Sequence, residues 1–225
     1  MTTYDYAKAH ACLTAVTGSK AYGLDHATSD TDRMSIFVSP SAEVSGLFWN
    51  QKDDSWTNTS PDGDDETFHE IGKYLRLALR GNPTLIELLF MDSYEYLDEV
   101  GKGLVEIRDH ITSEKTLRSS YRGYAYSQYM RILADGPEDF KPKMARHTLR
   151  IARQGLELLE TGTMNVRVPD PQEYWDLTER PYDEMIRIIE EPIDRLDDCP
   201  SVLRPQADLE TVAEFLGTVR RTYVN

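Results

Sequence analysis

The chain has 225 residues, of which 40% are hydrophobic and 28% charged, and its formal net charge at pH 7 is −14. This composition is typical of a globular protein and excludes a disordered chain or a membrane-embedded bundle. The negative charge repels long nucleic acids, so binding to a phosphate backbone requires a local basic patch or metal ions.

The sequence carries no targeting or membrane signal that we recognise. The opening residues, MTTYDYAKAH, lack the apolar run of a secretory signal, and no later run reaches the roughly 20 apolar residues of a membrane span. Cys12 and Cys199 lie far apart in sequence and offer neither a paired-thiolate metal site nor a disulfide framework. We expect a cytoplasmic protein without a membrane partner.

The first half of the chain mixes strand and helix patterns. Residues 12–17 and 33–38 are short, apolar and rich in strand-forming residues. Residues 50–65 are polar and rich in turn formers, which predicts a surface loop or hairpin tip. Apolar residues then recur at helical spacing from Ile71, and Gly81 is expected to end that helix before a buried segment follows.

From Ser113 onward the sequence is almost entirely helical in pattern. Ser113 is a cap-like residue, and helical periodicity follows through Leu133 and over residues 145–160, 182–196 and 209–223. We therefore expect an α+β fold with two domains. The predicted first domain, residues 1–110, is a small mixed β-sheet core flanked by helices. The predicted second domain, residues 111–225, is helical and completes a ligand cleft.

The stretch TGSKAYGLDHATSDTDRMSIFV, residues 17–38, places two aspartates one residue apart at the start of a predicted strand. In a strand, Asp30 and Asp32 would point to the same side and Arg33 to the other. Two carboxylates so close repel each other, and a divalent cation is the simplest compensation. The pattern predicts bound Mg²⁺ or Mn²⁺ of the kind that binds nucleotide phosphates.

The Gly-Ser pair in the same stretch fits phosphate binding. Gly18 lets the backbone approach an anion closely, and the hydroxyl of Ser19 can donate a hydrogen bond to a phosphate oxygen. Gly23 allows a second turn. Each motif occurs by chance in turns, so the prediction depends on the order and spacing of the two motifs and on the strands around them.

The Gly-Ser loop, Tyr22-Gly23, the Ser29-Asp30-x-Asp32 pair and the apolar strand that follows resemble the core motif of the DNA-polymerase-β-like nucleotidyltransferases. More narrowly, GSKAYGL, SDTD, GNPTLIELLF and KMARHTLRIARQGLELLETG resemble the small bacterial and phage predicted nucleotidyltransferases associated with RNA-repair ligases. The resemblance extends from about residue 13 to about residue 168. Ser35 stands where that family often has glycine, and residues 179–181 depart from its Arg-x-Gly turn.

The resemblance implies a third carboxylate on a neighbouring strand, which binds metal and accepts the proton of the acceptor hydroxyl. The matching position is Asp65, with Asp64 and Glu66 as competitors. Strand alternation would place Asp65, Thr67 and His69 on one face, which agrees with this assignment.

A basic stretch follows in the second half of an otherwise acidic chain. Lysines and arginines at 141, 143, 146, 150 and 153 precede the next acidic residue, Glu157. On a helix, Lys143, His147 and Arg150 share a face. A solvated or salt-bridged helix face is the simpler interpretation of such a run, but the resemblance implies that these three residues contact the triphosphate.

These patterns together predict a metal-dependent nucleotidyltransferase. Asp30, Asp32 and Asp65 would hold two Mg²⁺ ions or Mn²⁺ ions, and the expected substrate is a nucleoside triphosphate such as ATP. The acceptor hydroxyl stays open among an RNA or tRNA end, a protein side chain and a small molecule. The alternatives are a nucleotide-binding regulatory or partner module with the same fold and no transfer activity, and a kinase.

Overall fold

The computed structural model describes residues 3–44, 54–61 and 63–223. Within them the chain forms two compact units, which are described separately. The first unit comprises the described residues of Met1–Leu79, Met91–Ile111 and Asp208–Asn225. The second unit comprises Arg80–Phe90 and Thr112–Ala207.

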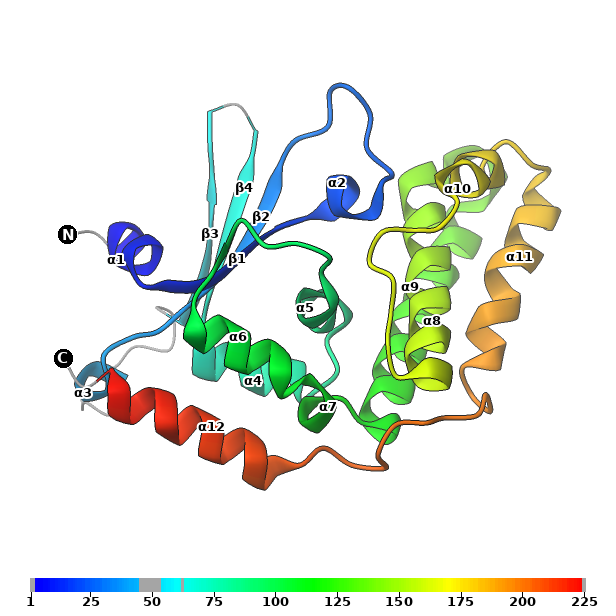
Figure 1. Cartoon of the computed structure of the whole chain (residues 1–225). Coiled ribbons are helices and arrows are strands. Elements are labelled where there is room, and N and C mark those ends of the chain that lie inside the picture. Colours follow the sequence, from blue (N-terminus) through cyan, green and yellow to red (C-terminus); the bar gives the residue numbers. More distant parts are fainter. Residues whose placement is uncertain (1–2, 45–53, 62, 224–225) are drawn as a thin grey trace. The chain divides into compact units, whose positions relative to one another are not determined.

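The first unit is built on a mixed β-sheet, whose five described strands have the spatial order β3-β4-β2-β1-β5 (Figure 1). The strands are β1 (Ala11–Thr17), β2 (Asp32–Phe37), β3 (Ser55–Thr59), β4 (Asp65–Glu70) and β5 (Tyr96–Leu97). β2 and β4 are parallel, whereas β1 pairs antiparallel with β2 and β5, and β3 pairs antiparallel with β4. The sheet and the helices around it confirm the predicted α+β fold.

Burial explains which strands could be predicted from the sequence. The predicted strands 12–17 and 33–38 match β1 and β2 within one residue at each end, because both carry buried apolar side chains. β3 was not predicted, since its sequence SWTNT is polar and largely exposed. β3 and β4 form a hairpin in the segment expected to be a loop or hairpin tip, and residues 50–53 and 62 of that segment lie outside the described residues.

Helices pack against this sheet within the first unit. They are α1 (Thr3–Ala9), α2 (Gly18–Tyr22), α3 (Ser41–Val44), α4 (Ile71–Ala78), α6 (Glu99–Glu106), α7 (Arg108–Ile111) and α12 (Leu209–Thr222). Ala7 of α1 is buried with Phe37 and Phe68, and Tyr6 and Trp56 border this cluster. α4 contacts β2 and β4, and α6 contacts β1.

Helix α12 belongs to the sheet unit although it is the last element of the chain (Figure 1). It contacts α4, α6 and α7. Arg220 of α12 places Nη2 at 2.6 Å from Oε1 of Glu70, which is 1% exposed at the end of β4. Arg220 Nη1 also donates to the carbonyl oxygen of Ser39. These contacts join the last helix of the chain to residues at the ends of β2 and β4 within one folded unit.

We expect Arg220→Ala to lower the free energy of unfolding by about 2 kcal/mol, because the substitution leaves the buried carboxylate of Glu70 without its cation. Urea unfolding followed by circular dichroism measures the loss. Arg221→Ala is the matched control, since Arg221 is exposed and donates a hydrogen bond to Thr218 of the same helix. Equal stability of the two variants would contradict a stabilising role for the Glu70–Arg220 pair.

The second unit is helical. It contains α5 (Pro83–Ile86), the 3₁₀ helix η2 (Glu87–Phe90), α8 (Glu114–Asp139), α9 (Pro142–Thr161), α10 (Pro171–Leu177) and α11 (Tyr182–Arg195). The long helices α8, α9 and α11 pack against one another (Figure 1). α8 and α9 approach closely at Gly155, where an added Cβ would lie 2.7 Å from the ring of Tyr121. None of the helices in the described residues is long and apolar enough to cross a membrane.

Candidate functional site

The Gly-Ser motif forms a short helical turn directly after β1. Gly18 has φ +68° and begins α2, and Gly23 has φ +70° and ends it. The amide of Leu24 donates to the carbonyl oxygen of Ser19 at 2.9 Å, which closes the turn. Both glycines occupy the left-handed region that other residues avoid, so the spacing Gly-x₄-Gly follows from the length of this turn.

Gly18 lies directly against the carboxylate of Asp32. Thr17 at the end of β1 is paired with Asp32 at the start of β2. A Cβ built on Gly18 would lie 2.1 Å from Oδ2 of Asp32, which is far inside van der Waals contact. The two motifs that stand a dozen residues apart in sequence are therefore in contact, and the glycine leaves the space that the carboxylate occupies.

We expect Gly18→Ala to destabilise the protein by about 1–2 kcal/mol through its positive φ alone, and to displace the Asp32 carboxylate as well. Gly123→Ala is the control, because Gly123 lies within helix α8 and an added Cβ would meet no atom within 4 Å. The control should be as stable as the wild type or slightly more so. Urea unfolding compares the two variants, and a Gly18→Ala protein as stable as the wild type would refute the importance of this contact.

Asp32 and Asp65 are neighbours at the starts of two parallel strands. Arg33 is paired with Glu66, and one residue earlier Asp32 begins β2 while Asp65 begins β4. Residues at matching positions of parallel strands point to the same face. The two carboxylates thus lie side by side at the end of the sheet next to Gly18.

Cross-strand hydrogen bonds fix the orientation of β4. Side chains of Asp65, Thr67 and His69 bond to partners on β3. The bond from Thr59 Oγ1 to Asp65 Oδ1 is 2.6 Å long. The predicted shared face of Asp65, Thr67 and His69 is therefore confirmed.

The two competing carboxylates have other partners, and those of Asp64 lie in the segment around Asp32. Oδ1 of Asp64 accepts a 2.7 Å hydrogen bond from the amide of Thr31. Glu66, on the opposite face of β4 from Asp65, lies 3.9 Å from Lys8 Nζ. The strand register thus favours Asp65 as the neighbour of Asp32 on this face, whereas Asp64 contacts Thr31 and Arg33 on either side of Asp32.

Asp30 lies outside the strand, which corrects the expectation that both aspartates belong to it. β2 begins at Asp32, so strand alternation does not set the direction of Asp30. A Cβ on Gly63, in the turn between β3 and β4, would lie 3.1 Å from Asp30 Oδ1. Asp30 therefore approaches the same hairpin whose second strand begins with Asp65. Arg33 pairs with Glu95, with Nε 2.8 Å from Oε2.

The donor set fits a divalent cation that is bound together with a phosphate. No three His, Cys, Asp or Glu side chains in the described part of the chain are grouped closely enough to hold a metal by themselves. Mg²⁺ commonly takes one or two carboxylates and completes its shell with water and substrate phosphates. The adjacent carboxylates of Asp32 and Asp65, beside the space left by Gly18, match that kind of site.

The predicted triphosphate contacts Lys143, His147 and Arg150 lie on α9 in the second unit. Lys143 is exposed, and His147 is partly buried. Arg150 is 1% exposed and bonds Glu87, also 1% exposed, at 3.0 Å. Arg150 also donates to Gln154 Oε1 at 2.6 Å. Its guanidinium is thus held inside the helical unit, which favours a positioning role over direct contact with a ligand.

The other arginines of the basic stretch also have partners within this unit. The guanidinium carbon of Arg146 lies 4.2 Å from the ring centroid of Trp175. Arg153 forms two 2.7 Å hydrogen bonds to Glu173. Much of the basic stretch therefore consists of salt-bridged or stacked side chains, which is the simpler of the two interpretations of its sequence.

Two histidines, the buried His69 and the partly buried His147, are neutral at physiological pH. Burial lowers the pKa of His147 to about 4, and the nearby Arg150 and Lys143 act in the same direction. Burial, with Lys73, lowers the pKa of His69 to about 4. Unfolding would return both to ordinary values near 6.5.

These pKa values predict a loss of stability in acid. The unfolded protein binds protons at both histidines below about pH 6.5 while the folded protein does not, so stability falls between about pH 6.5 and 4 and is unaffected above about pH 7. The loss is at most about 1.4 kcal/mol per pH unit for each histidine. Unfolding free energies at pH 7, 6 and 5 measure it. A double variant, His69→Gln with His147→Gln, should show a shallower pH dependence, and an unchanged slope would contradict the assignment.

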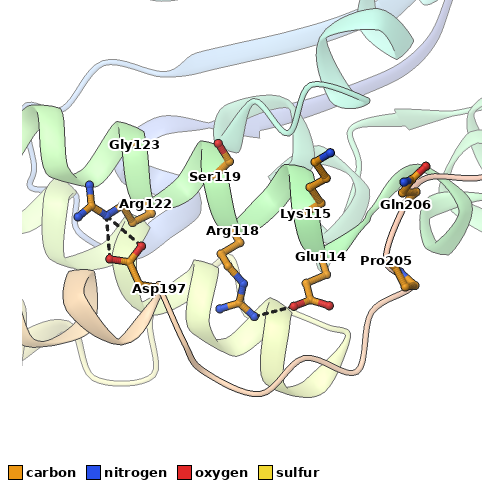
Figure 2. Close-up of a pocket in the computed structure, with 9 residues that line it drawn as sticks. All are labelled: Glu114, Lys115, Arg118, Ser119, Arg122, Gly123, Asp197, Pro205 and Gln206. Atoms are coloured by element: carbon orange, nitrogen blue, oxygen red, sulfur yellow. Dashed lines mark hydrogen bonds and ion pairs between the residues drawn. The ribbon is translucent and has the colours of Figure 1, made fainter.

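A groove of ≈ 710 Å³ lies in the second unit, along the first turns of α8 and the segment around Pro205 (Figure 2). It contains none of the predicted site residues. Arg118 pairs with Glu114 at 2.9 Å, and Arg122 pairs with Asp197 at 3.2 Å. Because carboxylates of the protein already pair with these two arginines, the lining of the groove is only weakly basic, with Lys115 as its one further cation.

The comparison with protein families agrees with the motifs. The model of the RNA repair pathway DNA polymerase beta family matches residues 6–190. The chain belongs to this family. A crystal structure of a nucleotidyltransferase-like protein from Exiguobacterium sibiricum is similar at 13% identity and a TM-score of 0.32, over 97% of this chain and 77% of that one. No curated protein is significantly similar in sequence.

Membership of the RNA repair pathway DNA polymerase beta family supports a nucleotidyltransferase-type function and confirms the resemblance seen in the sequence. The matched range contains the glycine turn, the aspartates and helix α9, but ends before α12. Ser35, where relatives often have glycine, is 1% exposed and shares a 2.9 Å hydrogen bond with Thr14. A serine at this position is thus accommodated without loss of hydrogen bonding.

Proposed function

We propose that this protein is a metal-dependent nucleotidyltransferase that transfers a nucleoside monophosphate from a nucleoside triphosphate to an acceptor hydroxyl. The observation that carries the proposal is the adjacency of Asp32 and Asp65 at the starts of parallel strands, with the Asp32 carboxylate against Gly18. Two like charges are placed together at the end of a sheet, beside a turn with a left-handed glycine. Such an arrangement costs stability unless a cation compensates it.

Asp32 and Asp65, together with phosphate oxygens of the substrate, are the proposed ligands of Mg²⁺ or Mn²⁺, and Asp30 is proposed as a further ligand, although no three such side chains in the described residues are grouped closely enough to hold a metal by themselves. When bound, the ions would neutralise phosphate charge and stabilise the oxygens that enter and leave the reacting phosphorus. Gly18 leaves room for Asp32 and for close approach of a phosphate, and Ser19 supplies a hydroxyl donor. Lys143 is the proposed phosphate contact of the helical unit, and His147 and Arg150 are proposed to act beside it as positioning residues, because both ring nitrogens of His147 already have hydrogen-bond partners.

Asp65 is the proposed base. Its carboxylate accepts the proton of the acceptor hydroxyl, whose oxygen forms a bond to the α-phosphorus. The bond between that phosphorus and the oxygen leading to the β-phosphate breaks, and pyrophosphate leaves. The hydrogen bond from Thr59 Oγ1 to Asp65 Oδ1 leaves the other carboxylate oxygen to receive the proton.

An RNA 3′ end, including that of a tRNA, is the acceptor that we favour. The family's description associates it with RNA repair, which supports a partner related to nucleic acid. The net charge of −14 disfavours extended contact with RNA and favours binding of one end.

The test is transfer of label from each α-labelled triphosphate, with Mg²⁺ or Mn²⁺, to total RNA, to tRNA and to protein. We expect label in RNA that is lost on chelation of the metal. Label in protein and none in RNA would exclude RNA as the acceptor, while the proposal of nucleotidyl transfer would stand. Label in no acceptor, with nucleotide binding intact, would favour a non-catalytic nucleotide-binding module.

A further inference from the structure

A chain of polar side chains runs from the interior of the helical unit to its surface. It starts at the buried ion pair of Glu87 and Arg150. Arg150 Nη2 lies 3.2 Å from His147 Nδ1, and His147 Nε2 lies 3.1 Å from the hydroxyl of Tyr124 on α8. Tyr124 is 38% exposed, so the chain ends at solvent.

The guanidinium of Arg150 fixes the direction of the hydrogen bonds that lead from it to Tyr124. A guanidinium only donates, so Nδ1 of His147 must accept from Arg150. The imidazole is neutral, as its lowered pKa indicates, so its proton is on Nε2. Nε2 therefore donates to the Tyr124 oxygen. The O–H of Tyr124 is then directed away from His147 and is available as a donor.

The surroundings of Tyr124 specify what its hydroxyl would bind. The side chain of Lys143 is exposed one helical turn before His147 on α9. A positive charge and a hydroxyl whose proton is available for donation suit an oxygen acceptor with negative charge, such as a phosphoryl oxygen. Successive donation from a buried arginine also polarises the chain in the direction that strengthens its last donor.

We propose that Tyr124 is a ligand-binding residue whose hydroxyl donates to a phosphoryl oxygen of the bound nucleoside triphosphate, and that His147 positions this hydroxyl. This inference rests on the nucleotide-binding function proposed above. It changes the role of Arg150, which orients His147 from inside the unit without touching the ligand.

The test is the Kd of the nucleoside triphosphate that the wild type binds best among ATP, GTP, CTP and UTP, measured by calorimetry with Mg²⁺. Tyr124→Phe removes only the hydroxyl and should raise Kd about 10-fold, as expected for one lost hydrogen bond to a charged group. Tyr126→Phe is the matched control, because Tyr126 is 41% exposed on the same helix. It should change Kd by no more than about twofold.

The positioning role of His147 has its own readout. His147→Phe should raise Kd as Tyr124→Phe does, and the double variant should show little further loss. His147→Gln should restore much of the affinity, because a glutamine amide can accept from Arg150 and donate to Tyr124. A merely structural role of His147 would give additive losses and no rescue by glutamine.

The outcomes separate this inference from the proposed function. Wild-type affinity in Tyr124→Phe would overturn the inference whatever the transfer assay shows. A wild type that binds triphosphate but labels no acceptor would refute nucleotidyl transfer, while the variants still decide the role of Tyr124. A wild type that binds none of the four triphosphates would overturn both.

Discussion

Replacing Asp32 by asparagine is expected to lower the proposed nucleotidyl transfer by at least about 10³-fold, because it removes a proposed metal ligand, and a bound ion would supply several kcal/mol of transition-state stabilisation. Asp65→Asn should lose as much, since it removes both a proposed ligand and the proposed base. Transfer from α-labelled triphosphate, measured at saturating metal, gives the ratio. The fold should persist, because asparagine has nearly the shape of aspartate.

The control for this pair lies next to it in sequence. Glu66 neighbours Asp65 but occupies the opposite face of β4, close to Lys8. Glu66→Gln should therefore leave transfer within about twofold of the wild type. If Glu66→Gln loses activity while Asp65→Asn retains it, the role of third carboxylate belongs to Glu66 instead of Asp65.

The buried pair in the helical unit gives the largest expected effect on stability. Glu87→Leu leaves the guanidinium of Arg150 buried without its carboxylate, because both side chains are 1% exposed. The expected loss is about 3–5 kcal/mol of unfolding free energy. Urea unfolding followed by circular dichroism measures it.

Two comparisons make the Glu87 prediction specific. Replacing both partners, Glu87→Leu with Arg150→Met, should recover much of the lost stability, since no uncompensated charge then remains. Glu173→Gln breaks the pair with Arg153, whose side chains are 36% and 45% exposed, and should cost less than about 1 kcal/mol. Equal losses in Glu87→Leu and Glu173→Gln would show that burial does not set the strength of these pairs.

The local sequence predicted those features that depend on local chemistry. Buried apolar strands gave β1 and β2 within one residue at each end, and helical periodicity gave α4, α9, α11 and α12 closely. Gly18 and Gly23 were recognised as turn glycines, and both have positive φ. The placement of Asp65, Thr67 and His69 on one face followed from strand alternation alone.

Other features depend on residues distant in sequence and were not predictable from local patterns. β3 is polar and is held by its pairing with β4 rather than by its own apolar residues. Asp30 was expected in a strand, but β2 begins two residues later. The contact between Gly18 and Asp32 is set by the β1–β2 register, which the sequence does not state.

The basic stretch shows the same limit most clearly. The family resemblance implied that Arg150 in this run contacts a triphosphate, yet Arg150 is buried against Glu87, 63 residues away. The sequence alone did not identify Glu87 as the partner of Arg150, because Glu87 lies in an apolar segment, GNPTLIELLF. An acidic residue within an otherwise buried segment was the available signal, since such a residue requires a cationic partner.

The most direct test is a crystal structure with Mn²⁺ and a triphosphate whose α–β bridge cannot be cleaved, because the anomalous scattering of manganese locates the ion independently. The account predicts manganese between the carboxylates of Asp32 and Asp65 and an α-phosphate oxygen, with the phosphates close to Gly18. Manganese bound elsewhere, or a nucleotide bound away from these two aspartates, would contradict it.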